Sequence, residues 1–270
     1  IRRPPRSTPF PTRRSSDLGV GVRDGAANSH AAILTRAMGI PAVMGADIRP
    51  GQLHKHLLIV DGYRGELLID PEPILIKEYQ RLIREENALS ETAETVAGQP
   101  GVMKHGEPVT ILLNAGLSAE LEQTMGDRVD GVGLYRTEVP FMLQSGFPSE
   151  EEQVAQYQGM LQVFNNKPVT LRTLDIGADK QLPYMPISEE NPSLGWRGIR
   201  LTLDQPEIFL VQVRAMLRAN AASGNLKILL PMITSIEEID EARKLIERAG
   251  HEVEEMLGYE IPRPQVGVMI

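Results

Sequence analysis

Apolar runs recur at regular intervals along the second half of the chain. Five of them have the length and the Val, Ile and Leu content of buried parallel strands. They are VTILLNAG (109–116), GVGLYRTE (131–138), VTLRTLDIG (169–177), KILLPMI (227–233) and VGVMI (266–270). Segments with helical spacing separate these runs, so strand and helix are predicted to alternate.

Helix-start signals support this alternation. Two Ser–Glu pairs have the spacing of capping boxes, and Asp204 is expected to open a third long helix just before Gln205 and Pro206. The two pairs are Ser149 with Glu152 and Ser235 with Glu238.

Alternation of this kind predicts an α/β fold with a parallel sheet, either doubly wound or a (β/α)8 TIM barrel. No G-x-G-x-x-G motif follows the first strand, which disfavours a dinucleotide-binding fold. Residues 106–270 hold one strand per about 33 residues, close to the spacing of a barrel that needs about 250 residues for eight units. We therefore expect the first five strands of a truncated barrel, with about three units absent.

The first half has shorter elements. A short helix is predicted with Asn28 or Ser29 as its N-cap and Gly39 as its stop. The strands LLIV and ELLI follow, separated by the turn DGYRG. We expect residues 19–75 to be part of a compact β/α domain and residues 76–105 to form a linker helix and loop.

Residues 1–18 (IRRPPRSTPFPTRRSSDL) show neither the strand nor the helix period. They lack the apolar stretch of a secretory signal, and they resemble translated sequencing-adapter sequence. We expect this stretch to be disordered and to contribute nothing to the fold.

Composition excludes several classes of protein. With 28 basic and 36 acidic residues the net charge is −8, which disfavours sequence-independent nucleic-acid binding. No apolar run approaches the roughly 18 residues of a membrane helix. The chain has no cysteine, which excludes disulfides and zinc fingers within it and favours a cytoplasmic location.

His30 is the histidine best placed for chemistry. It follows GAANS at the first turn of the predicted helix, where unpaired N–H groups and the helix dipole favour an anion. A neutral imidazole there could accept a phosphoryl group. The alternative is a histidine that fills a helix start without chemistry. His54 and His56 could hold a metal, but the sequence brings no third ligand within reach.

Two strands end in an Arg–Thr pair, Arg136 with Thr137 and Arg172 with Thr173. In a barrel this is the active-site face, where two guanidinium groups could clamp a phosphate or carboxylate. The alternative is that each arginine only pairs with a nearby acid such as Glu138 or Asp175. The loop NPSLGWRGIR (191–200) adds Arg197 and Arg200, and it could be either a ligand-binding loop or a loop that only packs.

Four segments together resemble enzyme I of the phosphoenolpyruvate phosphotransferase system. They are GAANSHAAILTRAMGIPAVMG, GLYRTEVPFM, LRTLDIGADKQLPYMPISEENPSLGWRGIR and ILLPMITSIEEIDEARKLI. The wording of NSHAAI and of GLYRTEVPFMLQSGFPSEEEQ is especially similar to the nitrogen-related branch, which implies a role in nitrogen regulation besides sugar transport.

The resemblance implies that His30 is the phosphorylated histidine and that Arg136 and Arg172 bind phosphoenolpyruvate, with Arg197 less firmly assigned. It implies a swivelling phosphohistidine domain, a TIM barrel that binds phosphoenolpyruvate and Mg²⁺, and a cytoplasmic homodimer. The phosphoryl group would pass to a small histidine carrier protein.

Some family features are absent from the chain. The carrier-binding region and a sensory GAF domain would lie before Gly19, and the Mg²⁺ ligands and a cysteine proton donor would lie beyond Ile270. We therefore expect an internal fragment, inactive on its own, in which no metal ligand can be named.

Two alternatives remain. The first is a pyruvate phosphate dikinase or phosphoenolpyruvate synthase relative, which would need an ATP-grasp domain upstream. The second is a regulatory docking module without turnover.

Overall fold

The computed structural model describes residues 19–23, 32, 35, 40–47, 53, 56–96, 99–116, 129–177, 182, 184–191 and 194–270. The stretch 1–18, expected to be disordered, lies outside these residues, as do the predicted cap at Asn28 or Ser29 and the stop at Gly39. The chain divides into two compact units, Ile1–Thr95 and Val96–Ile270.

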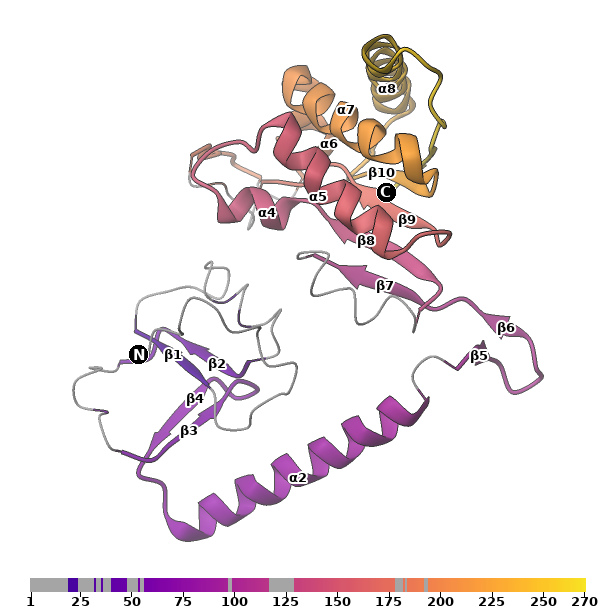
Figure 1. The fold of residues 1–270 in the computed structure, drawn as a ribbon. Coiled ribbons are helices and arrows are strands. Elements are labelled where there is room, and N and C mark those ends of the chain that lie inside the picture. Colours follow the sequence, from indigo (N-terminus) through magenta and orange to yellow (C-terminus); the bar gives the residue numbers. More distant parts are fainter. Residues whose placement is uncertain are drawn as a thin grey trace. The chain divides into compact units, whose positions relative to one another are not determined.

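The described part of the first unit has two pairs of strands and one long helix (Figure 1). Strands β1 (Val20–Val22) and β2 (Ala42–Met44) pair in parallel. Strands β3 (Leu58–Asp61) and β4 (Glu66–Ile69) pair antiparallel, which confirms the strands predicted on either side of DGYRG. Helix α2 (Pro73–Val96) confirms the helix predicted after them.

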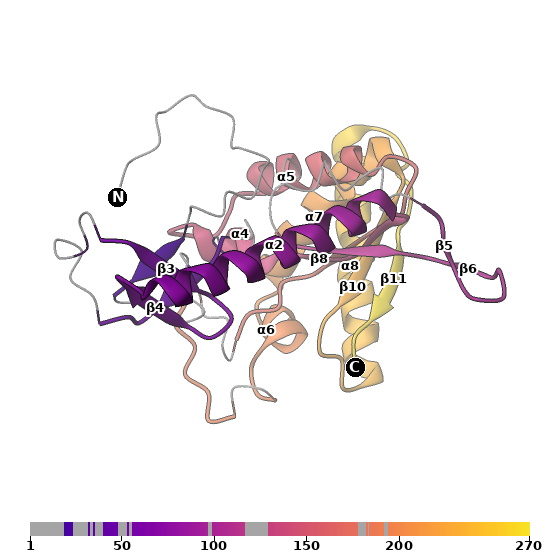
Figure 2. The same cartoon turned by 90° about the horizontal axis from the view of Figure 1, so that it is seen from below.

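Hydrogen bonds hold the β3–β4 hairpin against α2 (Figure 2). The Asp61 carboxylate accepts from the backbone N–H groups of Tyr63 and Arg64, which closes the turn, and from the Tyr79 hydroxyl of α2 at 2.8 Å. Burial opposes ionisation of Asp61, but these hydrogen bonds outweigh it and lower the pKa of its carboxyl. The turn and the helix therefore share one anchor.

The second unit contains a five-stranded sheet in which neighbouring strands are consecutive in sequence, in the order β11-β10-β9-β8-β7. All neighbours pair in parallel. The strands are β7 (Leu112–Ala115), β8 (Gly131–Arg136), β9 (Val169–Arg172), β10 (Leu226–Leu230) and β11 (Gln265–Val268). Each lies within or overlaps one of the five predicted apolar runs, so the α/β class and the parallel sheet are confirmed.

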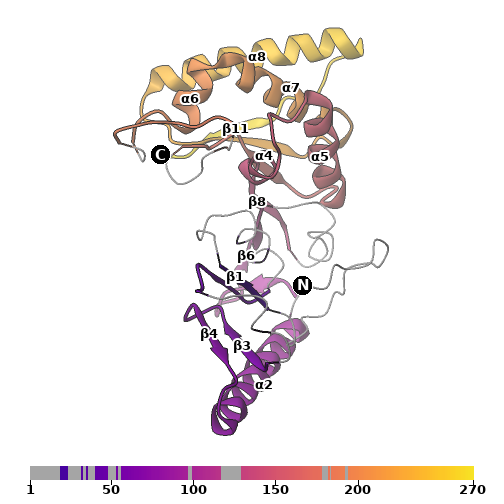
Figure 3. The same cartoon turned by 90° about the vertical axis from the view of Figure 1, so that its left-hand side faces the viewer.

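Helices α4 (Glu138–Leu143), α5 (Glu150–Val163), α6 (Gly198–Asp204), α7 (Pro206–Ser223) and α8 (Ile236–Leu257) connect these strands. Helix α7 packs against both α5 and α8 along one face of the sheet (Figures 1 and 3). Strand β10 shows this in its side chains, because Ile228 and Leu230 belong to the buried core whereas Lys227 is exposed. One face of the sheet is therefore covered by the helices.

The predicted capping boxes are present at both sites. The Ser149 hydroxyl accepts from the backbone N–H of Glu152, whose carboxylate accepts from the Ser149 N–H, and Ser235 and Glu238 repeat the arrangement.

The prediction that Asp204 opens a long helix is wrong. Asp204 is the last residue of α6, and α7 begins with Gln205 as its cap and Pro206 in its first turn. Proline preorganises the first turn without a side-chain cap.

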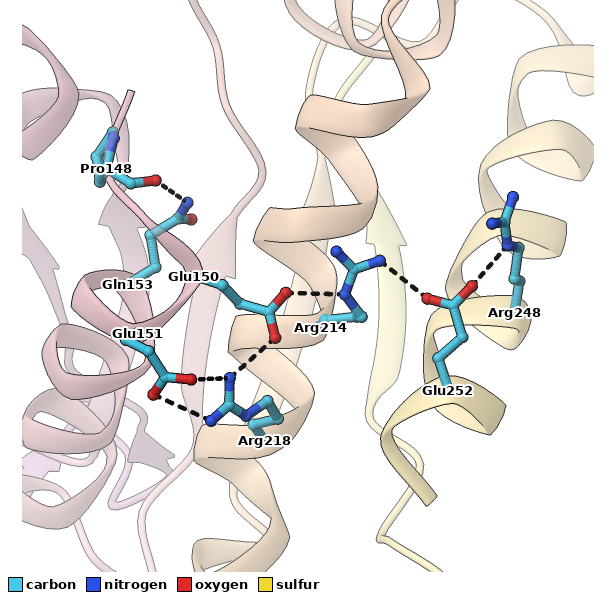
Figure 4. Close-up of polar contacts among 8 residues, drawn as sticks. All are labelled: Pro148, Glu150, Glu151, Gln153, Arg214, Arg218, Arg248 and Glu252. Atoms are coloured by element: carbon cyan, nitrogen blue, oxygen red, sulfur yellow. Dashed lines mark hydrogen bonds and ion pairs between the residues drawn. The ribbon is translucent and has the colours of Figure 1, made fainter. Parts of the chain in front are cut away.

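Two features were not predicted. The segment after α2 forms a small antiparallel pair, β5 (Gly101–Val102) with β6 (Pro108–Val109). An ion-pair network also joins the outer surfaces of α5, α7 and α8 (Figure 4). Within it, Arg214 contacts Glu150 of α5 at 2.8 Å and Glu252 of α8 at 2.9 Å.

Among the helices of the described residues, none is both long enough and apolar enough to cross a membrane.

Candidate functional site

Arg136 and Arg172 are neighbours at the carboxyl edge of the sheet. Arg136 ends β8, Arg172 ends β9, and the two are Cα partners in the register of these strands. The Arg136 side chain is exposed and has no ion pair with any described residue, whereas Arg172 is buried. The edge therefore offers one arginine to solvent and holds the other inside.

Two buried carboxylates form ion pairs with the Arg172 guanidinium. Its Nη2 lies 2.6 Å from Glu138 Oε1, and its Nη1 lies 3.2 Å from Asp175 Oδ2. Both acid side chains are only 2% exposed. Removing one partner of such a buried pair leaves an uncompensated charge and costs about 3–5 kcal/mol. The local ion pairs of the alternative explanation are thus present for Arg172, where they fix the planar fork in one orientation, and are absent for Arg136 among the described residues.

Asp175 also holds Arg197. Its Oδ1 lies 3.0 Å from Arg197 Nη2, so one carboxylate bridges the arginine at the end of β9 and the arginine that caps α6. Gly177 makes room for this approach, because a Cβ there would lie 2.5 Å from Arg197 Cβ. Its φ of 122° is also one that only glycine adopts without strain.

Several buried guanidinium nitrogens of Arg172, and of Arg197 and Arg200 at the start of α6, have no hydrogen-bond partner among the described residues. They are Arg172 Nε, Arg197 Nε, and Arg200 Nε and Nη2. A buried donor left unpaired costs about 1–3 kcal/mol, so such groups favour an anion that satisfies them. With the three arginines Arg136, Arg172 and Arg197 and the two described acids Glu138 and Asp175, this edge has the chemistry to bind a phosphate or carboxylate.

Aromatic side chains attach the loop after β9 to the loop after β8. The Tyr184 hydroxyl donates to the Phe141 carbonyl at 3.0 Å, and the ring packs edge-on against Phe147 with 5.1 Å between centroids. Burial raises the pKa of Tyr184 to about 12, so its hydroxyl keeps the donated proton at neutral pH. This contact helps to fix the loop that precedes Arg197.

His30 and His54 lie outside the described residues. Ala32 and Thr35, close to His30 in sequence, are helical and buried. His56 pairs with Asp70, and the hydrogen bond from this imidazole lowers the pKa of the Asp70 carboxyl. Among the described residues, no three His, Asp or Glu side chains form a group that could hold a metal ion.

Sequence reasoning missed Gln212, a buried amide of α7 that contacts the segments after β8 and β9. Its signal in the sequence is a polar residue among the apolar positions of an otherwise buried helix face, Phe209, Val213 and Met216.

Comparison with protein families gives two matches. Residues 90–270 match the family described as PEP-utilising enzyme, PEP-binding domain, and residues 18–65 match PEP-utilising enzyme, mobile domain. The first match contains the whole arginine cluster, and the second contains His30.

Among curated proteins, the chain is 75% identical over 253 residues to the "Phosphoenolpyruvate-dependent phosphotransferase system" protein of Escherichia coli (strain K12), covering 94% of this chain and 34% of that protein. It is 39% identical over 251 residues to the phosphoenolpyruvate-protein phosphotransferase of Staphylococcus carnosus (strain TM300), covering 91% and 43%. It is 40% identical over 227 residues to the protein of that name from Bacillus subtilis (strain 168), covering 82% and 39%.

The chain thus spans from about a third to two fifths of the length of these curated relatives. The PEP-binding-domain model covers well over half of the chain, from residue 90 to residue 270. The chain belongs to the family of PEP-utilising enzymes.

Proposed function

We propose that the protein containing this chain is a phosphoenolpyruvate-protein phosphotransferase of the enzyme I type. In this proposal His30 takes the phosphoryl group from phosphoenolpyruvate and passes it to a small histidine carrier protein, in the nitrogen-related branch of the system. The observation that supports it most is the arginine cluster at the carboxyl edge of the sheet, inside the region that matches the PEP-binding family.

Phosphoenolpyruvate has a phosphate and a carboxylate, and both are anions that arginine binds through paired N–H donors. In the proposal the exposed Arg136 and the buried Arg172 bind these groups, and Arg197 assists through its link to Asp175. Arginine stays charged at every relevant pH, so binding does not depend on protonation of the site.

The proposed chemical step is a phosphoryl transfer between the enol oxygen and an imidazole nitrogen. A ring nitrogen of His30 attacks phosphorus, the P–N bond forms and the P–O bond breaks. The enolate of pyruvate leaves and takes up a proton to become pyruvate. Guanidinium groups that face the phosphate stabilise the charge that builds up on its oxygens.

Enzymes that handle phosphoryl groups commonly use Mg²⁺ to neutralise charge. The described residues do not fit such an ion, because Glu138 and Asp175 already pair with arginines and no group of three metal ligands is present among them. A Mg²⁺ ion in the full-length protein would therefore need ligands other than these two carboxylates.

The proposal includes a swivelling phosphohistidine domain that contains His30, a (β/α)8 barrel to which the five-stranded sheet contributes, and a homodimer. Support for the first is the match to the mobile-domain family over residues 18–65. Support for the second is the consecutive parallel order of the strands, since a barrel is built from such units.

The test uses the full-length protein with labelled phosphoenolpyruvate, Mg²⁺ and a small histidine carrier. We expect acid-labile phosphate on His30, no labelling in His30→Ala, and wild-type labelling in the matched control His251→Ala, whose side chain is 74% exposed. A His30→Ala protein that still phosphorylated the carrier would contradict the role of His30. Labelling from ATP without phosphoenolpyruvate would favour a dikinase or synthase instead.

A further inference from the structure

The Gln212 side chain lies beneath the carboxyl ends of two strands and is fully buried. Its Oε1 accepts from the backbone N–H of Leu174 at 2.8 Å. Its Nε2 donates to the Thr137 hydroxyl and to the Tyr157 hydroxyl, both at 3.1 Å. One amide therefore joins α7 to the segments that follow β8 and β9 and to α5.

These partners are next to the two arginines of the edge. Thr137 directly follows Arg136, and its hydroxyl donates to the backbone carbonyl of Arg172 at 2.8 Å. Leu174 lies two residues after Arg172. Hydrogen bonds thus run from Gln212 to the Thr137 side chain, next to Arg136, and on to the backbone carbonyl of Arg172, and also to the backbone N–H of Leu174.

The hydrogen-bond pattern requires an amide at this position. The proton of Thr137 goes to the Arg172 carbonyl and that of Tyr157 goes to Gln153 Oε1, so both hydroxyl oxygens need a donor. The Leu174 N–H needs an acceptor. Glutamine supplies one acceptor and two donors, whereas glutamate supplies acceptors only and methionine supplies neither.

We propose that Gln212 is a positioning residue for phosphoenolpyruvate binding, which sets the spacing of Arg136 and Arg172 by tying the Thr137 side chain after β8 and the backbone after β9 to α7. The inference rests on the proposed function. Recognition by two guanidinium forks requires a fixed geometry, and displacement of a binding group by about 1 Å can reduce a rate by about a hundredfold.

Asn220 provides a matched control on the same helix. It is also a buried amide, but it lies at the opposite edge of the sheet. Its Oδ1 accepts from the backbone N–H of Leu226, the first residue of β10, at 3.0 Å, and its Nδ2 donates to the Pro262 carbonyl at 3.2 Å. Loss of this amide removes similar hydrogen bonds without touching either arginine.

The experiment compares Gln212→Met, Gln212→Glu and Asn220→Leu in the full-length protein. The measurements are kcat and KM for phosphoenolpyruvate in the transfer reaction, with the melting temperature of each variant. We expect both Gln212 variants to raise KM by about tenfold, the worth of one to two hydrogen bonds. Asn220→Leu should lower the melting temperature by about as much as the Gln212 variants do, because it loses similar hydrogen bonds. It should leave KM within about twofold of wild type.

Thr137→Val supplies a second route to the same answer, because it keeps the shape of the side chain and removes the link between Gln212 and the Arg172 carbonyl. It should raise KM even if Gln212→Met does not fold. Wild-type KM in Gln212→Met, or in Thr137→Val where Gln212→Met does not fold, would overturn the inference and leave the proposed function standing. So would an equal rise in KM for Asn220→Leu, because it would reduce the effect to general stability. If the wild-type protein takes no phosphate from phosphoenolpyruvate, the proposed function and the inference fall together.

Discussion

The two edges of the five-stranded sheet differ in buried charge, because the carboxyl edge holds the buried Glu138, Arg172 and Asp175 besides the neutral amide of Gln212. At the carboxyl edge, Arg172 and Arg197 share the carboxylate of Asp175, and several of the guanidinium nitrogens lack a partner among the described residues. At the amino edge lie two neutral amides, the buried Asn220 and the half-buried Asn225, whose Oδ1 also lacks a partner among the described residues. Asn225 Nδ2 contacts three backbone carbonyls, those of Leu161, Phe164 and Lys167, at 2.9–3.2 Å.

Burying charge is costly, and a buried ion pair is often less stabilising than apolar residues of the same volume. Neutral amides that satisfy backbone carbonyls stabilise the fold at a lower desolvation cost. Under the proposed function, the carboxyl edge keeps its buried charges for binding, whereas the amides of the amino edge serve the stability of the fold. Changes at the amino edge should lower the stability of the fold, and changes at the carboxyl edge should lower the rate of phosphate transfer.

The largest effect is expected for Arg172→Lys. Lysine keeps the charge but loses the planar fork that contacts both Glu138 and Asp175. The rate of phosphate transfer from phosphoenolpyruvate in the full-length protein should fall on the order of a hundredfold, as for the loss of one charge-stabilising donor. The transfer rate of Arg136→Lys should also fall substantially. Wild-type rates in both variants would make local ion pairing the better account of these arginines.

Gly177→Ala should come next. The new methyl group would lie 2.5 Å from Arg197 Cβ, at a φ of 122°, and the strain is about 1–3 kcal/mol. We expect Arg197 to move away from Asp175 and KM for phosphoenolpyruvate to rise. Gly224→Ala is the control at the amino end of the sheet, because its Cβ would meet nothing within 4 Å. It should lower only the melting temperature, and equal kinetics for the two variants would count against a binding role of this loop.

Asn225→Ala should affect the other edge alone. Removing the amide leaves three backbone carbonyls without this donor, and the free energy of unfolding should fall by about 1–3 kcal/mol. Urea denaturation of the full-length protein measures the loss. The transfer rate at saturating phosphoenolpyruvate should match wild type at a temperature where both proteins are folded. A large drop in kcat would contradict the claim that the amino edge affects stability alone.

The smallest effect concerns the ion pairs among α5, α7 and α8, which lie at neither edge (Figure 4). Hydrogen bonds from Arg248, and then from Arg214, outweigh desolvation and lower the pKa of Glu252 below its usual 4.5. A carboxyl whose pKa is lower in the folded state stabilises the fold above its unfolded pKa, and that stability is lost as pH falls through the folded value.

Glu252→Gln should therefore lower stability by on the order of 0.5 kcal/mol at pH 7, and the difference from wild type should shrink as pH falls below 4.5. Thermal melts of both proteins across this range measure it. A difference that grew on acidification would have the wrong sign. KM for phosphoenolpyruvate should not change.

Local signals in the sequence predicted much of the fold. The five strands follow from runs of apolar residues, and the starts of α5 and α8 follow from Ser–Glu spacing, because these features depend on neighbours along the chain. Asp204 misled because an acid before proline is typical of a helix start, whereas α6 extends through that residue.

The position of the arginines at the strand ends and the acids beside Arg172 could be predicted from the sequence, but the contacts between distant segments could not. Parallel strands bring their carboxyl ends together, so the end of each strand located Arg136 and Arg172. Asp175 bridges two arginines through a contact with Arg197, 22 residues away. Gln212 joins its neighbours through contacts with residues up to 75 positions away. No local pattern encodes such contacts.

Equilibrium binding of phosphoenolpyruvate to the full-length protein tests the central claim most directly. His30→Ala serves as the background, since it is expected to bind phosphoenolpyruvate without consuming it. Adding Arg136→Met and Arg172→Met should weaken binding on the order of a hundredfold, as two charge-assisted contacts are lost. Adding Asn225→Ala should leave the affinity unchanged. Equal affinity with and without the two arginines would contradict the assignment of the carboxyl edge as the binding site.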